Sequence, residues 1–168
     1  MWWWLVARLA AAEVVDRVVA VVEGLPVLAS EIRLEEAIAP FDPSPVPFWT
    51  SSADFQRTSI DALILRYLAA DVALYQPSRE QLAERVQALH DAFPDQAGWA
   101  VFLAAHGLDA ARIDVVVRRR MIVERFLLRN VQADPADRGS WLAESDELIA
   151  QLRPRVRIRI VEPREPAP

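Results

Sequence analysis

Residues 14–28 have the sequence VVDRVVAVVEGLPVL, and residues 155–161 have the sequence RVRIRIV. The β-branched residues in both favour strands, and Gly24 supplies the positive φ that a tight hairpin turn requires. An isolated hairpin is only marginally stable in water, whereas a third strand stabilises it. We therefore predict that the C-terminal strand pairs with the N-terminal hairpin and that the chain between them belongs to one closed domain.

The chain between these two stretches has the periodicity of helices. Apolar residues recur at i, i+3, i+4 and i+7, and each run is preceded by a residue type that caps helix N-termini. The predicted N-caps are Ser30, Ser51 or Ser52, Ser78, Asp109 and Ser140, with a further short helix from about Asp95 to His106. The predicted fold class is mainly α (α+β), with about six helices around a small antiparallel sheet.

The composition excludes several classes of function. With 168 residues and 53% hydrophobic content the chain is long enough for one globular domain with a core. A net charge of −5 argues against nucleic-acid binding, because counterion release from phosphates requires a basic surface. The chain has no cysteine, which excludes disulfides, thiolate nucleophiles and cysteine-ligated zinc.

Residues 1–12 are apolar but shorter than the roughly 20 residues that span a bilayer, so no membrane span is expected. Ala10 and Ala12 fit the small-x-small pattern of signal cleavage. We interpret residues 1–12 as a signal peptide or its remnant, which predicts export to the periplasm and a mature chain from about Glu13. Arg8 interrupts the apolar run, and the alternative is a hydrophobic N-terminus on a cytoplasmic protein. Residues 13–162 form the predicted domain, and the proline-rich residues 163–168 a disordered tail.

No residue pattern in the sequence indicates catalysis or a cofactor. His90 and His106 lie on different predicted helices without carboxylates at ligand spacing, so no metal site is expected. There is no nucleophile motif and no phosphate-binding glycine loop. Arg118, Arg119 and Arg120 form either an anion-binding stripe or a solvated helix face paired with acids, and the acidic composition favours the second interpretation.

The aromatic residues of the connector 40–50 are the candidate ligand-binding residues. Four prolines keep this segment from forming a helix. Phe41, Phe48 and Trp49 therefore either cover the core or are held at the surface, where they would bind extended peptides. We take them as the candidate peptide-binding residues. Trp99 and Trp141, which begin helices, are expected in the core.

Five segments resemble, in the same order, the N-terminal chaperone module of the SurA family of periplasmic folding factors. They are residues 15–31, 60–68, 102–108, 119–126 and 148–153. The resemblance implies a chaperone domain that binds unfolded polypeptides, most naturally outer-membrane proteins, without ATP. The first segment differs from the family pattern at Glu23, where the family usually has asparagine.

The family usually carries parvulin-type prolyl isomerase domains between the long helix and the closing helix. Here only residues 131–139 occupy that place, so the isomerase domains are absent and no prolyl isomerase activity is expected. The function implied by the resemblance is that of a non-catalytic periplasmic chaperone. The alternative is a structural or adaptor domain that binds one folded partner in the envelope.

Overall fold

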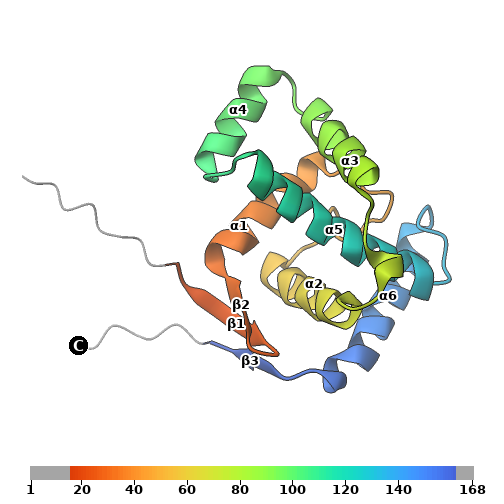
Figure 1. Cartoon of the computed structure of the whole chain (residues 1–168). Helices are drawn as coiled ribbons and strands as arrows, with labels where there is room; N and C mark the ends of the chain where they lie inside the picture. Colours follow the sequence, from red (N-terminus) through yellow and green to blue (C-terminus); the bar gives the residue numbers. More distant parts are fainter. Residues whose placement is uncertain (1–15, 162–168) are drawn as a thin grey trace, which may run out of the picture.

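The computed structural model describes residues 16–161, which fold into six α-helices and a three-stranded antiparallel sheet (Figure 1). The predicted fold class is thus confirmed. The interpretations of residues 1–12 and 163–168 lie outside the described residues. The elements are β1 Val18–Val22, β2 Leu25–Leu28, α1 Ala29–Ile38, α2 Phe55–Ala69, α3 Arg79–Asp91, α4 Gln96–Ala105, α5 Ala110–Asn130, α6 Arg138–Leu152 and β3 Ile158–Ile160. None of these helices is both long and apolar enough to cross a membrane.

The sheet joins the two ends of the chain, as the sequence predicts. Its strand order is β2-β1-β3, and Ala20 of β1 lies opposite Val27 on one side and Ile160 on the other. The expected alternation of buried residues along the C-terminal strand is only partly right. Val156 is buried and Ile158 is half-buried, but Ile160 is 52% exposed. Ile160 lies beside a surface hollow that α2 and α6 line, instead of beneath these helices.

The hairpin turn is held by the strand that closes the sheet. Glu23 and Gly24 both have positive φ, at 48° and 85°, a conformation that glycine tolerates and glutamate does not favour. The Glu23 carboxylate accepts a hydrogen bond from the backbone N–H of Arg157 at 2.7 Å and pairs with its guanidinium at 3.0 Å. These bonds lower the pKa of Glu23. The contact between Glu23 and Arg157 therefore joins the hairpin turn to the C-terminal strand at the residue whose backbone conformation is unfavourable.

Side-chain caps mark the start of every α-helix except α1. Ser78 and Gln81 form the predicted capping box of α3, and Asp109 caps α5 as predicted. The predicted caps of three other helices are wrong by a few residues. α1 begins after Leu28 without a side-chain cap, so Ser30 lies inside it, while Asp54 caps α2 and Asp137 caps α6. Aspartate caps a helix as well as serine does. Where both residue types lie close together, the sequence therefore does not show which of them is the N-cap.

α5 is the central element of the core (Figure 1). Its first half packs Ile113, Val117 and Met121 against α3 and α4, in a cluster that includes Trp99 and Phe102. Its second half packs Val123 and Leu127 against α2 and α6, in a cluster that includes Trp141. A third, smaller cluster lies between the sheet and α2. α5 thus connects the two larger clusters and supports the face of α2 that the sheet does not cover.

Removing the closing strand is expected to destabilise the whole domain. A chain ending at Arg153 loses Val156, which is buried against Ile60 and Ile64, together with the β1–β3 hydrogen bonds. The burial of one valine is worth about 1.5–3 kcal/mol, so a decrease of about 3 kcal/mol in the free energy of unfolding is expected. Urea denaturation followed by circular dichroism measures it, with a chain ending at Val161 as control. Equal midpoints for the two chains would contradict the role given to β3.

Candidate functional site

A groove of about 740 Å³ opens between β2, α1, α2 and the first half of α5. Its walls are mainly aliphatic, with charged side chains from α1, α2 and α5 among them. The lining residues are Leu25, Pro26, Val27, Leu28, Glu31, Leu34, Glu35, Trp49, Ser59, Ala62, Leu63, Arg66, Leu108, Ala111, Arg112, Val115, Val116, Arg119 and Arg120. The elements that meet here come from three separate parts of the chain, so the groove exists only in the folded domain.

Large apolar side chains remain accessible at this groove. Leu25 of β2 is 46% exposed and Val115 of α5 is 47% exposed, while Leu63 and Val116 are buried in the walls. A buried aliphatic side chain usually serves core packing. Exposed aliphatic side chains beside a concave surface instead indicate a binding surface. The groove can therefore accommodate apolar side chains of a ligand.

β2 contributes side chains to the groove but is a poor template for another strand. It is an edge strand, because only β1 pairs with it. Pro26 lies in its middle and has no backbone N–H to donate. Proline on an edge strand discourages strand addition. A ligand in this groove would therefore be held mainly by its side chains.

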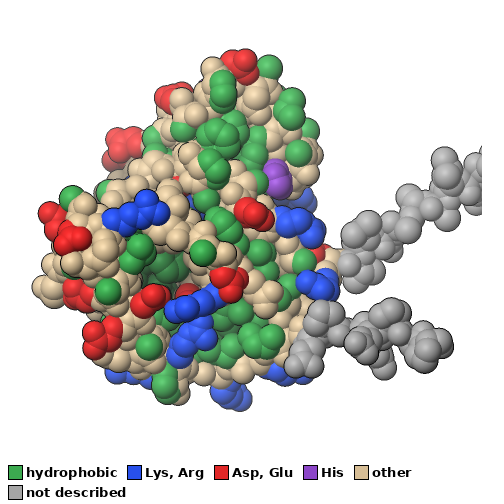
Figure 2. Space-filling view, turned by 180° about the vertical axis from the view of Figure 1, so that it is seen from behind, with side chains coloured by type: hydrophobic (Ala, Val, Ile, Leu, Met, Phe, Trp, Pro, Cys, Tyr) green, Lys and Arg blue, Asp and Glu red, His purple; other side chains and the backbone are tan. Residues whose placement is uncertain are grey.

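Ion pairs connect the elements that form the walls. Arg119 of α5 pairs with Glu31 of α1 at 2.9 Å. Arg120, whose side chain is 5% exposed, pairs with Glu35 of α1 and with Asp42 of the connector, the latter at 2.6 Å. These contacts hold α1 and the connector against α5. On the face of the molecule shown in Figure 2, acidic and basic side chains lie among hydrophobic ones.

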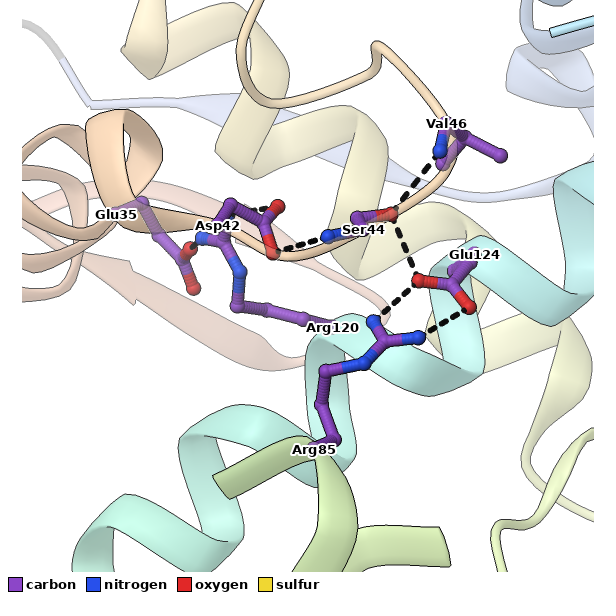
Figure 3. Close-up of polar contacts among 7 residues, drawn as sticks. All are labelled: Glu35, Asp42, Ser44, Val46, Arg85, Arg120 and Glu124. Atoms are coloured by element: carbon purple, nitrogen blue, oxygen red, sulfur yellow. Dashed lines mark hydrogen bonds and ion pairs between the residues drawn. The ribbon is translucent and has the colours of Figure 1, made fainter. Parts of the chain in front are cut away.

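A partly buried polar network fastens the connector to α5 (Figure 3). The Ser44 hydroxyl donates to Glu124 at 2.7 Å, and Glu124 also accepts two hydrogen bonds from Arg85 of α3, at 2.6 and 3.0 Å. The Ser44 backbone N–H donates to Asp42 at 3.2 Å. The connector between α1 and α2 is thus joined to α3 and α5.

Two pKa shifts follow from this network. Burial raises the pKa of Glu35 above its usual value even though Arg120 favours the ionised form. The hydrogen bonds that Arg85 donates to the Glu124 carboxylate raise the pKa of Arg85. Arg120 is the buried cation that pairs with both Glu35 and Asp42. Removing it would leave two carboxylates without this partner, so the packing of α1 and the connector against α5 depends strongly on Arg120.

The expectation that Phe48 and Trp49 are held at the surface is wrong. Phe48 is 8% exposed and Trp49 is 3% exposed. Their rings contact each other edge to face, 5.0 Å apart, and the Arg120 guanidinium lies 4.4 Å from the centre of the Trp49 ring. The prolines fold the connector back over α2 and α6, so these aromatics cover the core. Trp49 also forms part of the groove wall, but with little surface to offer a ligand.

The structure does not bring Phe41 together with these two residues. Phe41 is half-buried and stacks on Phe93 at the end of α3, with ring centres 4.1 Å apart. It belongs to the cluster around α3 and α4, whereas Phe48 and Trp49 belong to the cluster around α2 and α6. Trp99 and Trp141 are buried, as expected from the sequence.

The interpretation of the arginine stripe of α5 as a solvated face paired with acids is only partly right, because Arg119 and Arg120 pair with acids whereas Arg118 does not pair with any acid that the structure describes. Arg119 and Arg120 line the groove, and Arg120 is buried. Arg118 and Arg125 donate to the carbonyl oxygens of Pro77 and Gln76 and so join α5 to the segment before α3. Within residues 16–161, no three metal-ligating side chains gather in one place.

The sequence interpretation missed the exposed residues of the groove, although α5 carries a sign of them. Three consecutive valines, Val115 to Val117, cannot all face inward on a helix, because successive side chains are about 100° apart. Val115 is the one that faces outward. Arg66 is a second sign, as a charged residue within the otherwise apolar stretch of α2.

No protein-family model matches the chain, and no curated protein is detectably similar to it in sequence. The resemblance to the SurA family therefore stays a prediction that rests on the five segments described above.

Proposed function

We propose that the protein is a non-catalytic, ATP-independent chaperone that binds unfolded polypeptides, in particular unfolded envelope or outer-membrane proteins in the periplasm. The observation that carries the proposal is the groove between β2, α1, α2 and α5, with Leu25 and Val115 about half exposed at its sides. The five segments similar to the SurA family support the same function. The periplasmic location rests on the interpretation of residues 1–12.

The shape and chemistry of the groove suit unfolded chains better than one folded partner. Unfolded polypeptides present apolar side chains one or a few at a time, and a concave aliphatic surface accepts many different sequences of this kind. A domain dedicated to a single folded partner would instead be expected to present a flat patch with a polar rim. The groove therefore supports the chaperone over the adaptor alternative.

A pair of substitutions in the groove is expected to weaken the chaperone activity without unfolding the protein. Replacing Leu25 and Val115 by serine removes apolar contact area for the client. Because both side chains are half exposed, the free energy of unfolding should change by less than about 1 kcal/mol. The loss of about 1.4 kcal/mol of binding free energy should raise the concentration needed to suppress aggregation by about tenfold.

The assay dilutes a urea-unfolded outer-membrane β-barrel protein and follows its aggregation by light scattering. The matched control replaces Leu74 and Val101, which are 54% and 69% exposed and lie outside the groove, by serine. The control variant should protect the client as well as the wild type. Equal loss in both variants would mean that the groove is not the client site, and no protection by the wild type would refute the chaperone function.

A further inference from the structure

The groove is basic although the protein as a whole is acidic. Four arginines and two glutamates line it, whereas the whole chain has a net charge of −5. An excess of cations in a partly apolar groove concentrates anionic groups there. This contrast points to a ligand that is apolar and carries negative charge.

Three of the four arginines already have partners. Arg119 pairs with Glu31 and Arg120 pairs with Glu35 and Asp42. Arg112 donates to the carbonyl oxygen of Gly107 at 2.7 Å. The side chain of the remaining arginine, Arg66 of α2, makes no hydrogen bond or ion pair with any other residue in the range 16–161. It is therefore the cation available to a ligand.

The neighbouring carboxylates are occupied. One oxygen of Glu31 accepts from Arg119 at 2.9 Å, and the other accepts from the backbone N–H of Leu28 at 3.2 Å. Glu35 accepts from Arg120. Both glutamates are therefore directed to these partners and not to Arg66.

Arg66 is in an environment that disfavours its charge. Burial, and secondarily the nearby Arg119, lower the pKa of Arg66 to about 10. The guanidinium is still ionised at neutral pH. Glu31 and Glu35 are near enough to favour its charge, but neither forms an ion pair with it in the part of the chain that the structure describes. A planar guanidinium offers two parallel N–H donors that match a carboxylate.

We propose that the groove selects apolar segments that contain an aspartate or glutamate, whose carboxylate binds Arg66 while neighbouring apolar side chains contact Leu25 and Val115. This inference rests on the proposed function, because it specifies which segments of an unfolded chain are held. The carboxylate of an acidic side chain is the assigned source. An unfolded chain has many aspartate and glutamate side chains but only one C-terminal carboxylate. A groove that accepts internal segments therefore encounters acidic side chains far more often than chain ends.

Fluorescence anisotropy with three labelled ten-residue peptides tests the assignment. All contain the same leucine- and phenylalanine-rich sequence, and the ends are blocked except where stated. One has a central glutamate, one has glutamine in its place, and one has glutamine and a free C-terminal carboxylate. The wild type should bind the glutamate peptide about tenfold more tightly than the glutamine peptide, as expected for one charge-assisted pair.

Substitution of Arg66 should remove this preference specifically. Arg66→Gln should bring the two dissociation constants to within about twofold of each other, and Arg66→Lys should keep part of the preference because it keeps the charge but not the planar donor pair. Arg79→Gln, at an exposed position on α3 outside the groove, should leave the preference unchanged. If Arg66→Gln only disturbed the structure, the binding of both peptides would weaken equally and the ratio of their dissociation constants would stay the same.

Three outcomes would overturn the assignment. Equal affinity of the wild type for the glutamate and glutamine peptides, with binding still weakened by serine at Leu25 and Val115, would leave the chaperone groove standing without the acidic preference. If only the peptide with the free C-terminus bound more tightly, Arg66 would be a binding site for C-terminal carboxylates and not for acidic side chains. Absence of binding by all three peptides would refute the peptide groove together with this inference.

Discussion

Replacing Phe48 and Trp49 together by serine is expected to unfold much of the protein at 37 °C. Both side chains are buried, they contact each other, and they pack in the cluster that contains Trp141. Truncation of one buried large aromatic residue typically costs about 3–5 kcal/mol. Two such losses approach the whole stability of an ordinary domain, about 5–15 kcal/mol. Urea denaturation followed by far-ultraviolet circular dichroism measures the effect without depending on tryptophan fluorescence.

This experiment also separates the two interpretations of the connector. If the aromatics cover the core, the variant loses its folded signal at low urea. The serine pair at Leu74 and Val101, both exposed, controls for the mere loss of apolar side chains and should unfold near the wild-type midpoint. An unchanged midpoint for the Phe48 and Trp49 variant, combined with weaker protection of a client, would support the surface role that the sequence favours.

Replacing Arg120 by methionine is expected to lower the free energy of unfolding by about 3–5 kcal/mol at pH 8, the usual cost of removing one partner of a buried ion pair. Methionine fills a similar volume, so the variant leaves little empty space. The loss of stability arises because the carboxylates of Glu35 and Asp42, whose side chains are 16% and 4% exposed, no longer have a cationic partner. The cation–π contact with Trp49 is lost as well.

The size of this effect should depend on pH in a definite direction. Burial already raises the pKa of Glu35, and removal of Arg120 raises it further. A carboxyl group whose pKa is higher in the folded state than in the unfolded state takes up protons on folding, so its penalty is smallest at low pH and grows as pH rises through the folded pKa. The difference between variant and wild type should therefore be larger at pH 8 than at pH 5.

Urea midpoints at the two pH values test this dependence. Adding Glu35→Gln to the Arg120 variant supplies the control, because it removes the group that titrates and should reduce the change between pH 5 and pH 8. A loss of stability that is the same at both pH values would show that the variant suffers from poor packing and not from an uncompensated buried charge.

Most of the fold could be predicted from the sequence because local patterns and long-range packing agree. The strand patterns at the two ends and the capping box of Ser78 and Gln81 lead to the same elements that the structure has. Helix starts were less certain where several capping residues lie close together, as between Ser51 and Asp54. The choice there depends on how the helix packs, which no local signal encodes.

The groove could not be predicted in the same way, because it depends on which elements become neighbours. Val115 and Leu25 are about 90 residues apart in the chain, and each is an ordinary apolar residue of its own helix or strand. The burial of Phe48 and Trp49 has the same origin. The prolines show that the connector is not helical, but its path over α2 and α6 is fixed by the distant partners Arg120 and Glu124.

The pairing of β1 with β3 has a consequence for biosynthesis. A ribosome makes the hairpin first, but the central strand gains its second neighbour only after residue 160 has been translated. Contacts between such distant residues are slow to form. For most of translation the nascent protein therefore carries a hairpin with an unprotected β1 edge, which makes it a potential client of chaperones until its last strand emerges.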